Sequence, residues 1–180
     1  MDTYKVKWTK LQAEIFRFLS ISSGKSFNLR GLAKFLNVSP TAASNALSDL
    51  EKDEFVKVKR SETMNLLTIE FNRDSRKAID LKRVENLKQI YESGLVWFLE
   101  EKFPGNTIIL FGSYSRGEDV HNSDVDIAIV GTKGKDVDLG KFEKVLEKTI
   151  HVNFYKSWEL DKNLRDNILN GIVLIGGIEL

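Results

Sequence analysis

Residues 107–130 read TIILFGSYSRGEDVHNSDVDIAIV, which is two apolar runs on either side of a polar segment. The first run, Ile108 to Phe111, has the length and the branched side chains typical of a buried strand. It stops at Gly112 and Ser113, a turn without a bulky side chain. The second run, Ile127 to Val130, has the same apolar character. The pattern predicts two buried strands joined by a small turn and a charged connection.

Two aspartates stand at the entrance to the second run. Side chains alternate along a strand, so Asp124 and Asp126 are expected to share a face. Two neighbouring carboxylates repel each other unless a proton or a cation sits between them. Mg²⁺ is typically held by one or two carboxylates together with substrate phosphates. If a helix starts at Gly112–Ser113, its backbone N–H groups can meet a phosphate, so the segment predicts nucleotide chemistry. The alternative is an ordinary strand–turn–strand with solvated aspartates.

These residues carry a resemblance to a known family. Gly112-Ser113, ten further residues and then Asp124-x-Asp126 resemble the nucleotidyltransferase superfamily with the polymerase-β-like fold. With Arg116-Gly117 and Ser123-Asp124 in place, the run is similar to the minimal nucleotidyltransferase branch. The resemblance covers about the C-terminal half of the chain. It implies transfer of a nucleoside monophosphate from an NTP to an acceptor, with Mg²⁺ or Mn²⁺ bound by the catalytic residues Asp124 and Asp126.

The resemblance also assigns residues to the nucleotide. Those expected to bind it are Gly112, Ser113, Arg116 and Ser123. Gly112 would let the triphosphate approach the backbone, while Ser113 would add N–H and hydroxyl donors. Ser123 would cap or orient the turn before the aspartates. Arg116 would contact phosphate, and its other interpretation is a surface pair with Glu118 or Asp119.

In this superfamily a third carboxylate on the next strand normally helps to activate the attacking hydroxyl. The strand predicted from His151 to Tyr155 has His151 and Asn153 on one face, and neither is an acid. Asn153 is a candidate third metal ligand through its amide oxygen, although it cannot accept a proton as a carboxylate does. His151 is either a base or a hydrogen-bonded structural residue. We predict that Asn153→Asp, or His151→Asp if the register is shifted, raises Mg²⁺ affinity or activity.

The front of the chain has a different pattern. Apolar positions at helical spacing predict a helix from Thr9 to about Ser22, and Asn28 is a natural N-cap for a short second helix. Ser39-Pro40 opens a third helix with a cap followed by proline. Residues 55–60 and 67–71 alternate as two strands around a turn at 61–65. This order resembles the winged helix-turn-helix domain of archaeal and bacterial regulators.

That resemblance implies binding of double-stranded DNA. The third helix would enter the major groove, and cations of the wing would lie near phosphates. The residues expected to contact DNA are Thr41, Ser44, Asn45, Lys57, Lys59 and Arg60. This helix has no arginine or lysine before Lys52, so no bidentate guanine contact is obvious. The alternatives are a winged helix used for dimerisation or partner contact, and wing cations that only protect an edge strand.

The predicted fold class is α+β in three parts. Residues 1–72 form the winged helix-turn-helix, residues 73–103 a helical connector with a break at Ser93-Gly94, and residues 104–180 an α/β nucleotidyltransferase fold with a short mixed sheet. Further helices are expected around residues 139–150 and 160–169, and an apolar tail at 172–175. The connector is also a candidate dimer seam, so we expect a homodimer.

Composition adds few constraints. The chain has 42% apolar and 29% charged residues, as soluble globular proteins do, and no cysteine. Absence of disulfides, of a signal-peptide profile and of a membrane-length apolar run fits a cytoplasmic protein. Residues 1–92 hold 17 Lys and Arg against 12 Asp and Glu, a net +5, while residues 93–180 hold 10 against 14, a net −4. A polyanion would therefore approach the front half.

Three functional hypotheses follow. The first is a nucleotidyltransferase fused to a DNA-binding winged helix, with an acceptor that the sequence does not identify. The second is a DNA-binding transcriptional regulator whose degenerate C-terminal domain senses a nucleotide or a metal. The third is an antitoxin-like protein with a HEPN-type partner, as some minimal nucleotidyltransferases are.

Overall fold

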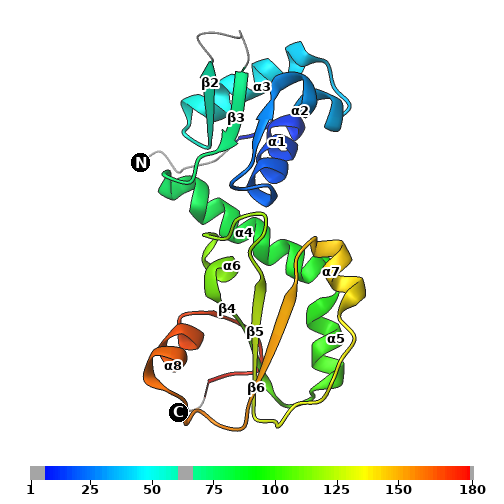
Figure 1. Ribbon diagram of the computed structural model, residues 1–180, viewed down its shortest axis with the longest axis vertical. Helices are drawn as coiled ribbons and strands as arrows, with labels where there is room; N and C mark the ends of the chain where they lie inside the picture. The colour runs from blue at the N-terminus through cyan, green and yellow to red at the C-terminus, as the bar shows by residue number, and fades with distance from the viewer. Residues whose placement is uncertain (1–6, 61–66, 179–180) are drawn as a thin grey trace. The chain divides into compact units, whose positions relative to one another are not determined.

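The computed structural model describes residues 7–60 and 67–178. The chain forms two compact units, residues 1–78 and 79–180 (Figure 1). The mixed α+β class predicted from the sequence is confirmed. None of the helices within these described residues is long and apolar enough to cross a membrane.

The N-terminal unit is a winged helix. Its elements are α1 (Lys10–Ile21), β1 (Ser26–Asn28), α2 (Leu29–Phe35), α3 (Pro40–Lys52), β2 (Val56–Arg60) and β3 (Leu67–Phe71). The strands form an antiparallel sheet in the order β1-β3-β2. Helices α2 and α3 are the helix-turn-helix, and β2 with β3 is the wing. The turn predicted at residues 61–65 lies outside the described residues.

Helix caps and an aromatic core explain why these elements form where they do. The amide of Ala42 donates to Ser39 Oγ at 3.1 Å, and Pro40 follows in the first turn of α3. The amide of Gly31 donates to Asn28 Oδ1 at 2.7 Å at the start of α2. The predicted caps of both helices are thus confirmed. The core of this unit includes buried apolar residues of α3 and the packed rings of Phe16 and Phe55.

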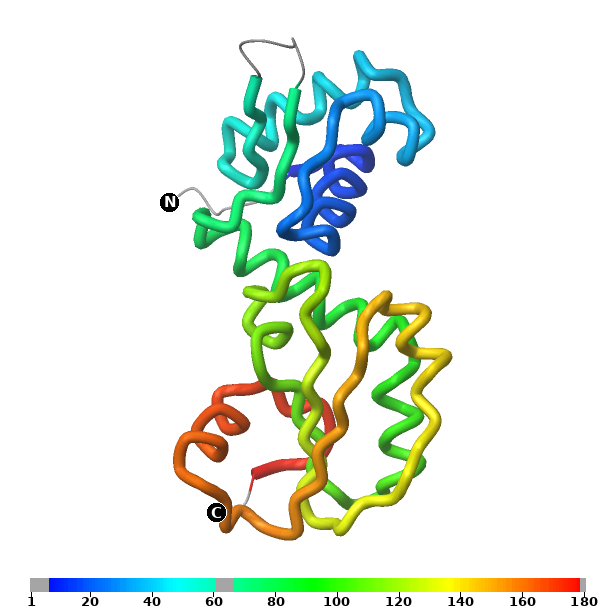
Figure 2. Tube along the Cα trace, in the orientation of Figure 1, coloured from blue at the N-terminus to red at the C-terminus, as the bar shows by residue number. Residues whose placement is uncertain are grey.

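The C-terminal unit is built on a mixed four-stranded sheet. Its elements, counting all of α4, are α4 (Arg76–Glu92), α5 (Leu95–Lys102), β4 (Thr107–Phe111), α6 (Gly112–Arg116), β5 (Val125–Val130), α7 (Gly140–Leu146), β6 (Ile150–Tyr155), α8 (Lys162–Leu169) and β7 (Ile172–Ile175). The strand order is β6-β5-β4-β7, with β5 and β6 parallel and the other pairs antiparallel. The apolar tail forms β7, which returns beside β4 (Figure 2).

Helices cover both faces of this sheet. On one face, Leu110 and Ile127 pack in a core with residues of α5 and α7. On the other face, Ile109 and Ala128 pack with Ile168 of α8. This alternation of buried residues on both faces explains the continuous apolar runs of β4 and β5.

The segment expected to connect the domains does not stand apart as a third unit. The predicted break is present, because α4 ends at Glu92, Gly94 has a φ of +79° and α5 follows. Leu95, Leu99 and Phe103 are buried in the core of the C-terminal unit. The division of the chain into domains after residues 72 and 103 stays a proposal. The two compact units divide the chain between Ala78 and Ile79.

Candidate active site

The small turn after β4 is in direct contact with one of the two aspartates. Gly112 has a φ of +75°, a conformation that glycine adopts readily. A Cβ added to Gly112 would lie 2.5 Å from Asp126 Oδ2, so any other residue there would collide with the carboxylate. Phe111 is also the register partner of Asp126 between β4 and β5. The turn and this aspartate therefore lie next to each other.

Three polar side chains lie close together at the start of β5, next to this turn. Asp124 precedes the strand and Asp126 is its second residue, with Val125 buried between them. His151 of β6 is the register partner of Asp126. Its Nε2 atom lies 3.4 Å from Asp124 Oδ2, and both side chains are about half exposed. Asp124, Asp126 and His151 thus face one small region on the same side of the sheet.

The site holds Asp126 in an environment that disfavours its charged form. Burial raises the pKa of the Asp126 carboxyl, His151 lowers it and the neighbouring Asp124 raises it again. Burial and a like charge both disfavour the ionised state, so the net direction is upward. A bound cation would relieve this penalty.

The donor set fits a hard divalent ion. Carboxylate oxygens suit Mg²⁺ or Mn²⁺, and Mg²⁺ commonly takes only one or two carboxylates and completes its shell with water and substrate phosphate. No group of three or more His, Cys, Asp or Glu among residues 7–60 and 67–178 is arranged to hold a metal ion. Asp124 and Asp126 are two carboxylates that can serve as ligands of such an ion.

Asn153, the predicted third metal ligand, lies one repeat further along β6. Its register partner is Ala128, whereas the partner of Asp126 is His151. Residues paired across parallel strands share a face, so Asn153 has the predicted orientation. The β6 residue paired with Asp126 is nevertheless His151.

The remaining expected nucleotide ligands have different surroundings. Arg116 donates from Nε to Glu118 Oε2 at 2.8 Å and from a guanidinium nitrogen to Asn167 Oδ1 at 3.3 Å. This is the surface pair that was the second interpretation of Arg116. Ser123 Oγ accepts from the amide of Val120 at 2.9 Å, which agrees with a role in orienting the turn. Ser113 is half-buried in α6.

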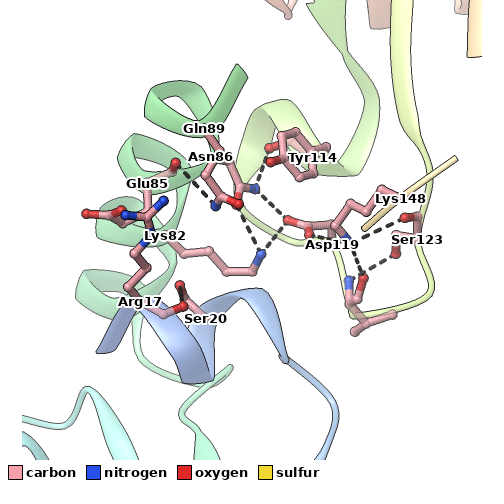
Figure 3. A network of polar contacts seen from close by, with 11 residues as sticks. Arg17, Ser20, Lys82, Glu85, Asn86, Gln89, Tyr114, Asp119, Ser123 and Lys148 are labelled. Atoms are coloured by element: carbon pink, nitrogen blue, oxygen red, sulfur yellow. Dashed lines mark hydrogen bonds and ion pairs between the residues drawn. The ribbon is translucent and has the colours of Figure 1, made fainter. Parts of the chain in front are cut away.

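Sequence reasoning missed a buried polar cluster below this turn. Asp119 is 1% exposed and contacts Lys82, Asn86 and Lys148 (Figure 3). Lys82 and Asn86 are four residues apart on α4, at the spacing of side chains that share a helix face. The position of Lys82 and Asn86 among apolar neighbours in the sequence was the one available sign of their burial. Their partner Asp119 lies on a loop far along the chain, so a local sequence pattern does not reveal it.

The expected DNA-contacting residues lie on the surface of the N-terminal unit. Thr41, Ser44 and Asn45 are exposed on α3. Lys57 forms an ion pair with Asp74, and the lysine lowers the pKa of that carboxyl. Lys59 Nζ lies 3.6 Å from Glu70 Oε2, and Arg60 is exposed at the end of β2. Two of the three wing cations therefore already have acidic partners.

Comparison with known proteins finds a family model that matches part of the chain. The family model described as a nucleotidyltransferase domain matches residues 93–175. A search of the curated proteins finds no match.

Solved structures with a likeness to the chain include two bacterial proteins. The adhesin competence repressor AdcR from Streptococcus pyogenes has 21% identity and a TM-score of 0.42, covering 58% of this chain and 72% of the other. ZitR from Lactococcus lactis, a zinc-responsive MarR family member, has 21% identity and a TM-score of 0.41, covering 58% and 70%.

Proposed function

We propose that the C-terminal unit is a nucleotidyltransferase that moves a nucleoside monophosphate from an NTP to an acceptor. The observation that carries the proposal is the contact between the Gly112 turn and the Asp126 carboxylate. In a segment that matches the nucleotidyltransferase family model, this contact brings the start of α6 next to a pair of carboxylates.

Each residue of the site has a proposed task. Asp124 and Asp126 hold Mg²⁺ or Mn²⁺, which when bound orients the α-phosphate and neutralises charge that develops on it. Gly112 leaves room for the triphosphate, and Ser113 donates to it. Arg116 reaches phosphate only by leaving Glu118, so its contribution is proposed to be secondary.

The proposal also predicts slow chemistry. Positions 151 and 153 hold a histidine and an asparagine, so this face of β6 offers no carboxylate as a general base for the acceptor hydroxyl. Loss of a positioned general base typically costs ~10²–10⁴ in rate. The imidazole of His151 is proposed to take over part of that task, because an unprotonated ring nitrogen can accept a proton.

Nucleotide binding is the direct test. The full chain is heated with each NTP, with and without Mg²⁺, because a ligand that binds the folded state raises the unfolding temperature. We expect stabilisation that requires both NTP and Mg²⁺ and that disappears in the double variant Asp124→Ala, Asp126→Ala. Incubation with labelled ATP, Mg²⁺ and cell extract should then label an acceptor with the wild type only. No Mg²⁺-dependent stabilisation by any NTP would refute the proposal.

A second candidate is a DNA-binding regulator whose C-terminal unit binds a nucleotide or metal without transferring it. The winged-helix order of elements, with exposed small polar residues on α3, favours DNA binding. The lack of a third acid favours binding without transfer. A gel shift with the gene's own upstream DNA at low salt, with and without NTP, tests it, because phosphate contacts are strongest there. Unchanged migration at low salt would remove this candidate.

Two proposals concern partners. We propose a homodimer because the helical connector is a candidate dimer seam, and a HEPN-type protein as a partner because of the family resemblance. Light scattering on the purified chain tests the first, and a pull-down from the source cell tests the second.

A further inference from the structure

Asp119 is held from two sides within the C-terminal unit. Its Oδ1 atom accepts from Lys82 Nζ at 2.6 Å and from Asn86 Nδ2 at 2.6 Å, both on α4. Its Oδ2 atom lies 3.2 Å from Lys148 Nζ, just before β6. The side chains of Asp119 and Lys82 are 0% exposed and that of Lys148 is 3% exposed. Three charged groups are thus buried together (Figure 3).

The same side chains bind the backbone on both sides of Asp119. Asn86 Nδ2 also donates to the carbonyl of Tyr114, at 2.9 Å, inside α6. Lys148 Nζ donates to the carbonyl of Val120 at 2.7 Å and to that of Ser123 at 3.3 Å. These hydrogen bonds explain why Oδ2 of Asp119 has an ion pair with Lys148 but no aligned hydrogen bond. The cluster therefore contacts the segment next to Ser113 and the residue before Asp124.

A close backbone contact reinforces the attachment to α4. Gly117 has a φ of +73°, and a Cβ added to it would lie 2.5 Å from the carbonyl oxygen of Ile79 and 2.8 Å from the amide nitrogen of Arg83. Unlike a side chain, these backbone atoms cannot turn aside. The segment from Ser113 to Asp124 is thus fixed on α4 at Gly117 and through Asp119.

Stability alone does not explain a buried group of three charges. Taking ions out of water is costly, and apolar residues of similar size are often neutral or stabilising in their place. Buried charges do impose direction, because each ammonium must point at its acceptors. We propose that Asp119, with Lys82, Asn86 and Lys148, is a positioning residue that fixes the segment between Ser113 and Asp124, so that Asp124 meets Asp126 at the Gly112 turn.

The role of Asp119 in metal binding rests on the proposed function. That Asp119 fixes the segment between Ser113 and Asp124 can be tested without it. Outer residues that orient metal ligands typically contribute ~10–100-fold to metal affinity. In the full chain, Asp119→Asn should raise the Mn²⁺ concentration for half-saturation about 10–100-fold, measured by electron paramagnetic resonance with an ATP analogue that cannot be cleaved. Saturating Mn²⁺ should restore full analogue binding, a rescue that a loss of folded protein would not show.

A matched control is Asp136→Asn, which removes an exposed carboxylate of the same kind and should leave the Mn²⁺ titration unchanged. If Asp119→Asn does not fold, the triple variant Lys82→Met, Asp119→Leu, Lys148→Met replaces all three charges by apolar residues and is expected to fold. It should show the same weakened Mn²⁺ binding. A folded variant of either kind with wild-type Mn²⁺ affinity would overturn the proposal.

Amide hydrogen exchange separates this proposal from the proposed function. In a folded Asp119→Asn or triple variant, peptides that cover residues 113–124 should exchange faster than in the wild type, without metal or nucleotide. If the wild type binds no Mn²⁺–nucleotide, the proposed function fails, and the exchange rates alone decide whether Asp119 fixes the segment. Unchanged exchange in a folded variant would contradict the positioning role.

Discussion

Gly112 shows how one missing side chain leaves room for a neighbouring carboxylate. Alanine at this position would meet two obstacles, the positive φ and the Asp126 carboxylate. The first is a backbone cost of about 1–2 kcal/mol. The second costs little stability, since the end of the Asp126 side chain can rotate away. That rotation would remove the carboxylate from the place where a cation is proposed to bind.

Gly112→Ala should therefore lose Mg²⁺-dependent nucleotide binding about 10–100-fold while the free energy of unfolding falls by only about 1–2 kcal/mol. Two other glycines serve as controls. Gly105 has a φ of +77° and nothing within 4 Å of an added Cβ, so Gly105→Ala should show the backbone cost alone. Gly177 also has nothing within 4 Å and lacks the positive φ, so Gly177→Ala should change neither property. Equal nucleotide affinities in all three variants would contradict this account.

The raised pKa of Asp126 makes the free energy of unfolding depend on pH when no metal is added. Its pKa is raised above the ordinary 3.8, so between that value and the raised one the folded state binds more protons than the unfolded state. This contribution to stability is fully present below 3.8 and is lost as the pH rises through the window.

Asp126→Asn lacks this titration. Its stability relative to the wild type should rise as the pH increases from 3 to 7, by less than about 1 kcal/mol because the carboxylate is still reached by solvent. Urea unfolding of both proteins at several pH values in EDTA measures the difference. A relative stability that falls over this range would mean that attraction from His151 outweighs burial. Asp136→Asn is the control for general effects of acid.

Whether two residues can be predicted to lie close together depends on how far apart they are in the sequence. The proximity of Gly112, Asp124 and Asp126 could be predicted because all three lie within one short stretch and because strand alternation puts the aspartates on one face. Asp119 was not predicted as part of a cluster. Its partner Lys82 is 37 positions away, and only the packing of α4 on the turn brings them together.

At the scale of elements, the register of β6 decides which residue faces the aspartates. The sequence predicts that His151 and Asn153 share a face, and the pairing with β5 gives them that shared side. It also places His151 level with Asp126 and Asn153 level with Ala128. Alternation fixes a face but not the register, since register depends on the loop that precedes the strand.

The register leads to a choice between two substitutions. His151→Asp should raise Mg²⁺ affinity about tenfold by adding a third carboxylate beside the pair, as ligand charge count tunes such sites. Asn153→Asp should change it little. Without Mg²⁺, His151→Asp should destabilise the chain, because three carboxylates repel one another and the attraction to His151 is lost. Calorimetric titration with Mg²⁺ and nucleotide tests this, and a larger gain from Asn153→Asp would contradict the register.

Helix α4 marks where reasoning from periodicity was wrong. Apolar residues at helical spacing predict one buried face that continues from α4 into α5, made of Ile79, Val84, Leu87, Tyr91, Leu95 and Phe98. In the structure Val84 is 60% exposed, while Lys82 and Asn86 are buried. Apolar spacing predicts the inner face only when the partner surface is apolar. Here α4 meets a polar turn at Asp119, so its inner face is polar at that level. The caps of α2 and α3 were predicted correctly because a cap involves only residues within one turn.

At the scale of the whole molecule, the chain consists of two units, each with its own core. Trp8 packs on Phe16 and Phe55 in the first unit, with ring centroids 4.7 and 5.0 Å apart. Trp158 packs against the Ile109 and Ile168 cluster on the α8 face in the second unit. The chain therefore contains a fluorescent reporter for each core.

These reporters allow the proposed nucleotide site to be assigned to one unit. Trp8→Phe leaves emission only from Trp97 and Trp158, whereas Trp97→Phe with Trp158→Phe leaves only Trp8. Nucleotide with Mg²⁺ at about 100 times its dissociation constant adds about 2.7 kcal/mol to the state that binds it. For a unit of this size that is a rise of about 10 °C or more in the midpoint of thermal unfolding.

We expect this rise in the chain that reports through Trp158, and a smaller one in the chain that reports through Trp8. Mg²⁺ alone and nucleotide alone are the controls, and neither should raise the Trp158 midpoint by a comparable amount. DNA should give the opposite pattern if α3 binds it, with the larger rise at Trp8. A nucleotide-dependent rise confined to Trp8 would place the nucleotide on the winged helix and contradict the site at Gly112 and Asp126.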